Sequence, residues 1–187
     1  MKNMAIFASG SGTNAENLIN YFKNDSRVKI KVIVTNNDKA GVIARAERHK
    51  KNLHIISKKA LEQYTSQIID FLKSEKIDLI VLSGFLLKIP VPLIQAFPNQ
   101  IVNIHPSLLP KYGGKGMYGN HVHEAVIAAK EKTSGITVHF VNEEYDQGEI
   151  ILQESCEISE NDTAEALAHK IHQLEYKYFP QAIEKLL

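Results

Sequence analysis

A length of 187 residues and an apolar content of 44% are enough for one α/β domain with a sizeable core, so we expect a single domain over residues 1–187. The formal net charge of +1 gives no overall basic field and does not favour a nucleic-acid partner. A single cysteine, Cys156, excludes an internal disulfide framework, and no apolar stretch is long enough to span a membrane. These features predict a soluble, cytoplasmic protein without a membrane partner.

Short apolar runs alternate with stretches of helical periodicity through the first two thirds of the chain. The run at 77–84 is almost continuously apolar, as expected of a strand that is covered on both faces. Residues 60–75 carry apolar side chains at helical spacing and predict one amphipathic helix. The expected strands are 4–9, 29–36, 53–57, 77–84 and 100–105, and the expected helices are the segment from Ala15 onward, 40–51, 60–75, 90–98 and 121–132.

The pattern changes near residue 133. Two strand-like runs, 133–142 and 148–158, are separated by a connection too short for a helical crossover, so we expect them to pair antiparallel. A long helix over 162–187 closes the sequence, with Asp162 or Thr163 as its N-cap. The sequence therefore predicts a three-layer, Rossmann-like α/β fold: a mostly parallel sheet with an antiparallel end and helices on both faces.

Three unusual stretches follow expected strands. They are "SGSGTN" at 9–14, "SGF" at 83–85 and "NIHPS" at 103–107. In open α/β sheets, ligands bind outside the carboxyl ends of the strands. The shared position of these stretches predicts a ligand site at that edge of the sheet.

The stretch at 9–14 lies between a strand and a helix, where glycines allow close approach and the helix N-terminus attracts an anion. With Ala15 it also fits the loose dinucleotide pattern G-x-G-x-x-A. However, the second strand ends in "VTNN", without the acidic residue that would hold a ribose. We therefore favour a phosphomonoester over a dinucleotide, and a plain tight turn is the structural alternative.

Asn103 and His105 alternate along the strand at 100–105, so both side chains point to the same side. An amide donor beside an imidazole is suited to binding a developing oxyanion and moving a proton. Asp146 lies before a glycine-containing turn and, taken alone, is more typical of a turn residue. The sequence has neither a cysteine cluster nor an H-E-x-x-H motif, so no metal site is expected.

Five stretches together resemble one enzyme family. "SGSGTN", "SGFL", "NIHPSLLPKY", "SGITVHFVNEEYDQGEIILQ" and "LEYKYFP" occur in this order and spacing across essentially the whole chain. In these stretches the sequence resembles the folate-dependent formyltransferases, and among them the phosphoribosylglycinamide formyltransferases of purine biosynthesis. The pairing of "NIHPSLLPKY" with "VNEEYDQG" is specific to folate-dependent formyl transfer.

The resemblance implies roles for individual residues. Asn103, His105 and Asp146 match the family's catalytic trio. Gly12, Thr13 and Asn14 match the loop that holds the phosphate of phosphoribosylglycinamide, and Glu175 matches the carboxylate that binds its ribose. The positions that match the walls of the 10-formyltetrahydrofolate pocket are Leu86, Leu87, Lys88, Ile89, Val141, Asn142, Glu143 and Glu144.

The resemblance also implies a mechanism and partners. The glycine amine of the ribonucleotide attacks the formyl carbon of 10-formyltetrahydrofolate, Asn103 donates to the formyl oxygen, and His105, kept protonated by Asp146, stabilises the intermediate and transfers protons. No metal or covalent enzyme intermediate is expected. The partners are the two small-molecule substrates, and the protein is expected to be a monomer or a homodimer.

Three other functions compete with this interpretation. A methionyl-tRNA formyltransferase would need a further C-terminal domain and a basic surface, and a formyltetrahydrofolate hydrolase normally carries an extra N-terminal domain. A non-catalytic folate- or nucleotide-binding module would not need a histidine with an aspartate partner. The glycine-rich segment at 113–120 is longer than in many family members, and we expect it to be a mobile flap.

Overall fold

The computed structural model of this protein describes all of residues 1–187. By its contacts the chain divides into two units, Met1–Asn103 with Leu187, and Ile104–Leu186. Each is described by itself, and the expectation of a single domain stays a prediction. No helix combines the length and the apolar character that a membrane crossing requires.

The first unit is a parallel sheet covered by helices. β1 pairs with β2 and β4, β2 with β3, and β4 with the start of β5, all in parallel. Its strands are β1 (Lys2–Phe7), β2 (Val28–Thr35), β3 (Asn52–Ile55), β4 (Leu79–Leu82) and β5 (Ile101–His105), the last of which ends in the second unit. Every residue of β4 is buried, which agrees with its continuously apolar sequence.

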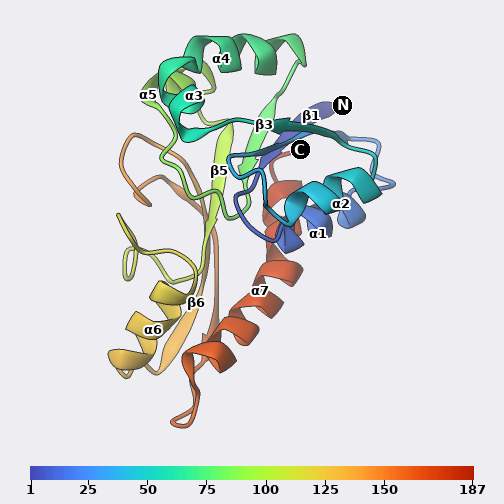
Figure 1. Ribbon diagram of the computed structural model, residues 1–187. Helices are drawn as coiled ribbons and strands as arrows, with labels where there is room; N and C mark the ends of the chain where they lie inside the picture. The colour runs from blue at the N-terminus through green and yellow to red at the C-terminus, as the bar shows by residue number, and fades with distance from the viewer. The chain divides into compact units, whose positions relative to one another are not determined.

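Five helices flank these strands. They are α1 (Thr13–Tyr21), α2 (Val42–Arg48), α3 (Lys58–Gln63), α4 (Thr65–Ser74) and α5 (Val91–Ala96). Figure 1 shows α1 and α2 together on one side of the parallel strands, with α3, α4 and α5 on the other.

The second unit contains an antiparallel pair and two helices. β6 (Thr133–Phe140) pairs with β7 (Ile150–Glu157), which confirms the antiparallel arrangement expected from the short connection. α7 (Ala164–Glu184) packs against both strands and against α6 (Asn120–Ala128). The strand order β3-β2-β1-β4-β5-β6-β7 is that of a mostly parallel sheet with an antiparallel end, as the sequence predicts.

The expected single helix over 60–75 is wrong in one respect. Tyr64 leaves helical geometry at φ −119° and ψ 31°, so the segment forms two helices, α3 and α4. The Ser57 hydroxyl caps α3, and the Thr65 hydroxyl donates to the Leu61 carbonyl across the break. Tyr64 is half exposed.

Candidate active site

Ser9, two residues after β1, connects the segments that follow three strands of the first unit. Its N–H donates to the Gly84 carbonyl at 3.0 Å, and its hydroxyl oxygen accepts from the Leu86 N–H at 2.9 Å. The same hydroxyl donates to the side-chain oxygen of Asn36, after β2. Two of the three stretches singled out in the sequence, 9–14 and 83–85, therefore meet as expected.

The loop at 9–14 has the geometry of an open helix start. Gly12 precedes α1 with φ at +76°, a left-handed conformation that glycine adopts without strain, and α1 has no side-chain cap. A Cβ atom at Gly12 would lie 2.6 Å from the Val42 side chain, so a larger residue does not fit. Because the start of α1 lacks a side-chain cap, the positive end of the helix makes this loop suited to an anion.

Asn103 and His105 lie two residues apart on β5, and the alternation of a strand directs both side chains to one side. Asn103 is paired with Leu82 at the end of β4 and is partly exposed, whereas only 4% of His105 is exposed. The strand thus presents an amide at the sheet edge and a buried imidazole just beyond it.

The hydrogen bond of His105 fixes its tautomer. Its Nε2 lies 2.7 Å from the Tyr112 carbonyl, and since a carbonyl only accepts, Nε2 carries the hydrogen. In the neutral ring Nδ1 then holds the lone pair, and it lies 3.7 Å from Oδ2 of Asp146. Nδ1 is therefore the nitrogen that can take up a proton beside a carboxylate.

Asp146 lies on the loop between β6 and β7 and faces two histidines. Its Oδ2 accepts from the Gly114 N–H at 2.8 Å, and its Oδ1 lies 3.6 Å from Nε2 of His139. His139 donates from Nδ1 to the Phe140 carbonyl at 2.8 Å, so its Nε2 also turns toward the carboxylate. Burial opposes ionisation, but His139, His105 and the Gly114 N–H together hold the pKa of Asp146 below its usual value.

The charge state of His105 differs from the expectation. Burial lowers the pKa of His105, and the opposing effects of the Asp146 charge and the Tyr112 carbonyl do not overcome it. Asp146 acts in the expected direction, but the net pKa lies below the ordinary value of 6.5. His105 is therefore neutral near pH 7, and the expectation that Asp146 keeps it protonated is wrong for the free protein.

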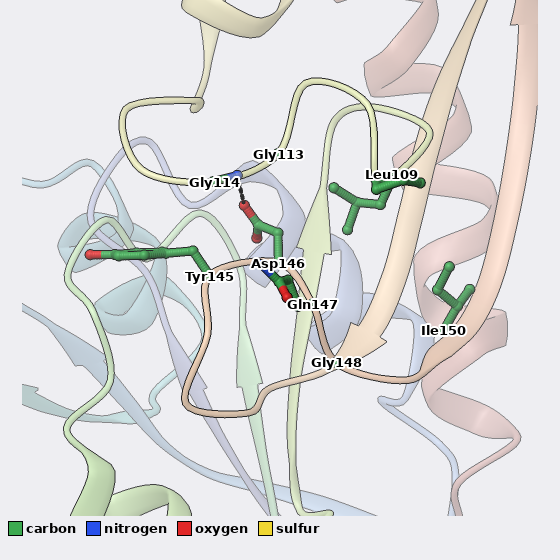
Figure 2. Close-up of a pocket in the computed structure, with 9 residues that line it drawn as sticks. Leu109, Gly113, Gly114, Tyr145, Asp146, Gln147, Gly148 and Ile150 are labelled. Carbon is green, nitrogen blue, oxygen red and sulfur yellow. Dashed lines mark hydrogen bonds between the residues drawn. The ribbon is translucent and has the colours of Figure 1, made fainter.

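A pocket of about 390 Å³ opens beside Asp146. Figure 2 shows the Asp146 side chain directed from its loop toward the Gly113–Gly114 backbone, with Tyr145 at one end of the pocket and Leu109 and Ile150 at the other. The lining combines apolar side chains, glycine backbone and one carboxylate. A mostly apolar lining with a few polar groups is typical of small-molecule sites.

Glu175 lies on α7, and only 6% of it is exposed. Its Oε2 lies 2.9 Å from Nδ1 of His172, whose pKa it raises. His123 on α6 is equally buried, its Nδ1 has no hydrogen-bond partner, and burial lowers its pKa although the Glu175 charge acts against this. Glu175 is therefore a buried carboxylate among histidines, and its role toward a ribose stays a prediction.

The predicted folate positions fall in two separate stretches. Leu86 and Lys88 are exposed and Leu87 is half-buried, whereas only 4% of Ile89 is exposed, so Ile89 offers chiefly its backbone to a ligand. Asn142, Glu143 and Glu144 are exposed and Val141 is half-buried. None of these eight residues lines the pocket beside Asp146, and their contacts with folate stay a prediction.

The segment at 113–120 reaches the site through its backbone. The Gly114 N–H donates to Asp146. Gly113 packs so closely here that a Cβ atom on it would lie 2.6 Å from the Leu109 side chain and 3.3 Å from Asp146. Farther along, Tyr118 packs edge-to-face on His121 at 5.3 Å between ring centroids. The expected mobility of this segment stays a prediction.

Sequence reasoning singled out the stretches 9–14 and 113–120 but not the individual contacts of Ser9 and Gly114, and it did not single out His139. His139 lies in a regular strand, and nothing in its spacing distinguishes it from a structural histidine. Gly114 and Ser9 contribute backbone and hydroxyl contacts that depend on the fold. The signal that could have found Ser9 was its place in the first glycine-rich stretch.

These features agree with comparisons to known proteins. The family model described as "Formyl transferase" matches residues 2–183. The chain belongs to the formyl transferase family. A phosphoribosylglycinamide formyltransferase of Bacillus subtilis is 37% identical over all of this chain and 95% of its own length. The chloroplastic enzymes of Arabidopsis thaliana and Vigna unguiculata are 38% and 40% identical, and the chain spans only 64% and 61% of their lengths.

Solved structures of family members give the same result for the fold. The crystal structure of phosphoribosylglycinamide formyltransferase from Bacillus halodurans has a TM-score of 0.91 at 38% identity, covering all of this chain and 95% of the other. Glycinamide ribonucleotide transformylase 1 from Geobacillus kaustophilus also has a TM-score of 0.91, at 36% identity, covering 100% and 99%. The fold class and the family predicted from the sequence are confirmed.

Proposed function

We propose that this family member transfers the formyl group of 10-formyltetrahydrofolate to the glycine amine of phosphoribosylglycinamide in purine biosynthesis. The observation that supports this most is the pair formed by His105 Nδ1 and Asp146 Oδ2, 3.7 Å apart beside a pocket in a formyl transferase chain. A buried base with a fixed tautomer and an ionised carboxylate next to it is the apparatus that proton transfer during acyl transfer requires.

The reaction starts with attack of the amine nitrogen on the formyl carbon. A C–N bond forms, and the carbonyl electrons move to the formyl oxygen, where the amide of Asn103 donates a hydrogen bond. His105 takes the extra proton of the amine on Nδ1, the nitrogen left free by the bond to Tyr112. The proton then passes to N10 of the folate, the C–N10 bond breaks, and tetrahydrofolate leaves.

Asp146 stabilises the imidazolium that exists only during this sequence. Because His105 is neutral in the free protein, the carboxylate acts most strongly when the charge develops, which favours the transition state over the ground state. His139 and the Gly114 N–H hold Asp146 ionised and oriented for this task. These two groups are positioning residues.

The two substrates are held by different parts of the chain. Gly12, Thr13 and Asn14 bind the phosphate of phosphoribosylglycinamide at the start of α1, and Glu175 accepts from its ribose hydroxyls. The folate is bound along Leu86, Leu87, Lys88, Ile89, Val141, Asn142, Glu143 and Glu144, with main-chain groups as the principal contacts. We further propose that residues 1–187 act as one cytoplasmic formyltransferase domain, as a monomer or a homodimer.

One assay separates this function from its alternatives. The protein is incubated with 10-formyltetrahydrofolate, with and without phosphoribosylglycinamide, while the folate absorbance is followed. Turnover that requires the ribonucleotide supports the proposal. Turnover without it indicates a formyltetrahydrofolate hydrolase, and no turnover in either case indicates a non-catalytic binding module.

A further inference from the structure

Residues of α2 hold the loop at 9–14 from one side, through hydrogen bonds and packing. The Val42 N–H donates to the Gly10 carbonyl at 3.1 Å, and the Val42 side chain lies against Gly12. Nε of Arg45, one turn along the helix, donates to the Ser11 carbonyl at 2.8 Å. Two consecutive carbonyls of the loop therefore point at α2.

This arrangement fixes where the loop N–H groups point. In a trans peptide the carbonyl and the N–H of the next residue point in opposite directions. With the Gly10 and Ser11 carbonyls directed at α2, the N–H groups of Ser11 and Gly12 point away from it, toward the side on which the proposed phosphate would bind. A glycine-rich loop has many other conformations, so a contact that holds this one lowers the entropic cost of binding.

The hydrogen bond from Arg45 to the Ser11 carbonyl is made by a side chain, so a substitution can remove it. The Arg45 guanidinium also pairs through Nη1 with Glu16, in the first turn of α1, so one planar group connects the loop to the helix that follows it. Glu16 also accepts from Nη1 of Arg48 at 3.0 Å, but Arg48 is mostly exposed and has no bond to the loop. The two arginines share a helix and a carboxylate and differ in the contact with Ser11.

We propose that Arg45 is a positioning residue that holds the loop at 9–14 in the conformation that binds the phosphate of the acceptor substrate. This inference rests on the proposed function, because the acceptor is assigned there. Arg45 acts through the Ser11 carbonyl and does not touch the phosphate. Its effect therefore belongs to acceptor affinity and not to the chemical step or to the folate.

The test compares Arg45→Met with Arg48→Met, which removes the same charge from the same helix. In steady-state kinetics we expect Arg45→Met to raise the KM for phosphoribosylglycinamide about tenfold, the usual effect of one lost hydrogen bond to a charged group, while kcat and the KM for folate change less than twofold. Arg48→Met is expected to change all three less than twofold. Arg45→Lys is expected to lie between, because one ammonium cannot hold both Ser11 and Glu16 as the fork does.

Equal effects of the two Met substitutions, or an Arg45→Met loss shared by kcat and both KM values, would overturn the inference in favour of a merely structural role. Thermal unfolding of each variant identifies any that fails to fold, and Arg45→Lys then carries the comparison.

A second readout needs no activity: inorganic phosphate should shift the Ser11, Gly12 and Thr13 amide signals of the wild-type protein at concentrations about tenfold lower than in Arg45→Met. If phosphate shifts these amides in this way and formyl transfer is absent, the proposed function fails and the role of Arg45 stands. If phosphate leaves the wild-type amides unchanged, Arg45 does not hold an anion loop.

Discussion

At the scale of single residues, the decisive feature is the competition between burial and charge at His105. A sequence that shows a histidine and an aspartate in one site favours a raised pKa, because the carboxylate attracts the imidazolium. Sequence does not show how deeply the ring is buried, and here burial outweighs Asp146. The result is a neutral base in the free protein, which suits removal of a proton from an attacking amine.

Asp146→Asn keeps the shape of the side chain and removes its charge. We expect kcat to fall by a factor of roughly 10²–10⁴, the span usual for positioned acid–base groups. The substitution removes an influence that raises the pKa of His105, so this pKa should fall further below 6.5. Because the proposed reaction needs neutral His105, the acid limb of the pH profile of kcat/KM should move to lower pH, and NMR titration of the His105 ring should follow it.

Near-normal turnover of Asp146→Asn with an unshifted acid limb would contradict this account and return Asp146 to the role of a turn residue. A control substitution on the same loop must avoid the proposed folate positions, which excludes the exposed residue Asn142. Glu149→Ala is the better control, since this exposed residue lies outside the proposed contacts.

His123→Leu should be tolerated and should change the response to acid. The buried Nδ1 of His123 has no partner, and an unsatisfied buried polar group costs about 1–3 kcal/mol. We therefore expect Tm at pH 7.5 to be no lower than in the wild type. Burial lowers the folded-state pKa of His123 below its unfolded value of 6.5, so wild-type stability falls as the pH drops from about 6.5 through the folded pKa.

The variant lacks this loss, and its advantage in Tm should grow between pH 7.5 and 5.5. The lowered pKa of His105 also reduces stability in acid, but His105 is present in both proteins. The raised pKa of His172 increases stability as the pH falls. Calorimetry at several pH values measures the difference. A Tm for His123→Leu that lies below the wild type by the same amount at every pH would show that the ring fills a structural role.

At the scale of elements, the loop between β6 and β7 is closed by a glycine. A Cβ atom at Gly148 would lie 1.7 Å from the Phe140 carbonyl oxygen, the acceptor for His139. Gly148→Ala must therefore move the end of β6, and with it His139 and Asp146. We expect kcat to fall more than tenfold and Tm to decrease, while Glu149→Ala, one residue further, changes both little. Full activity of Gly148→Ala would mean that the geometry of this loop does not position Asp146.

The elements themselves were largely predictable, because their signals are local. Its continuous apolar character predicted β4, and a connection too short for a helix predicted the antiparallel pairing of β6 and β7. The break at Tyr64 was missed because apolar spacing continues across it, and spacing does not report that Tyr64 leaves helical geometry. Strand and helix ends differ from expectation by a few residues for the same reason.

At the scale of the whole molecule, the family was predictable because its motifs extend along the entire chain, and both the family and the fold class are confirmed. The site was predictable only in part. Asn103, His105 and Asp146 could be named from motifs, but His139 and Gly114 approach Asp146 from separate elements, which only the folded chain brings together. The roles of all the named residues stay predictions until they are measured.

The most direct test of the central claim follows the formyl group itself. 10-Formyltetrahydrofolate carrying ¹³C in the formyl position is mixed with the protein and phosphoribosylglycinamide, and the carbon is observed by NMR. We predict that the label appears as a formamide on the glycine nitrogen, in an amount equal to the tetrahydrofolate released. Label recovered as free formate, or left on the folate while the ribonucleotide stays unchanged, would contradict the account.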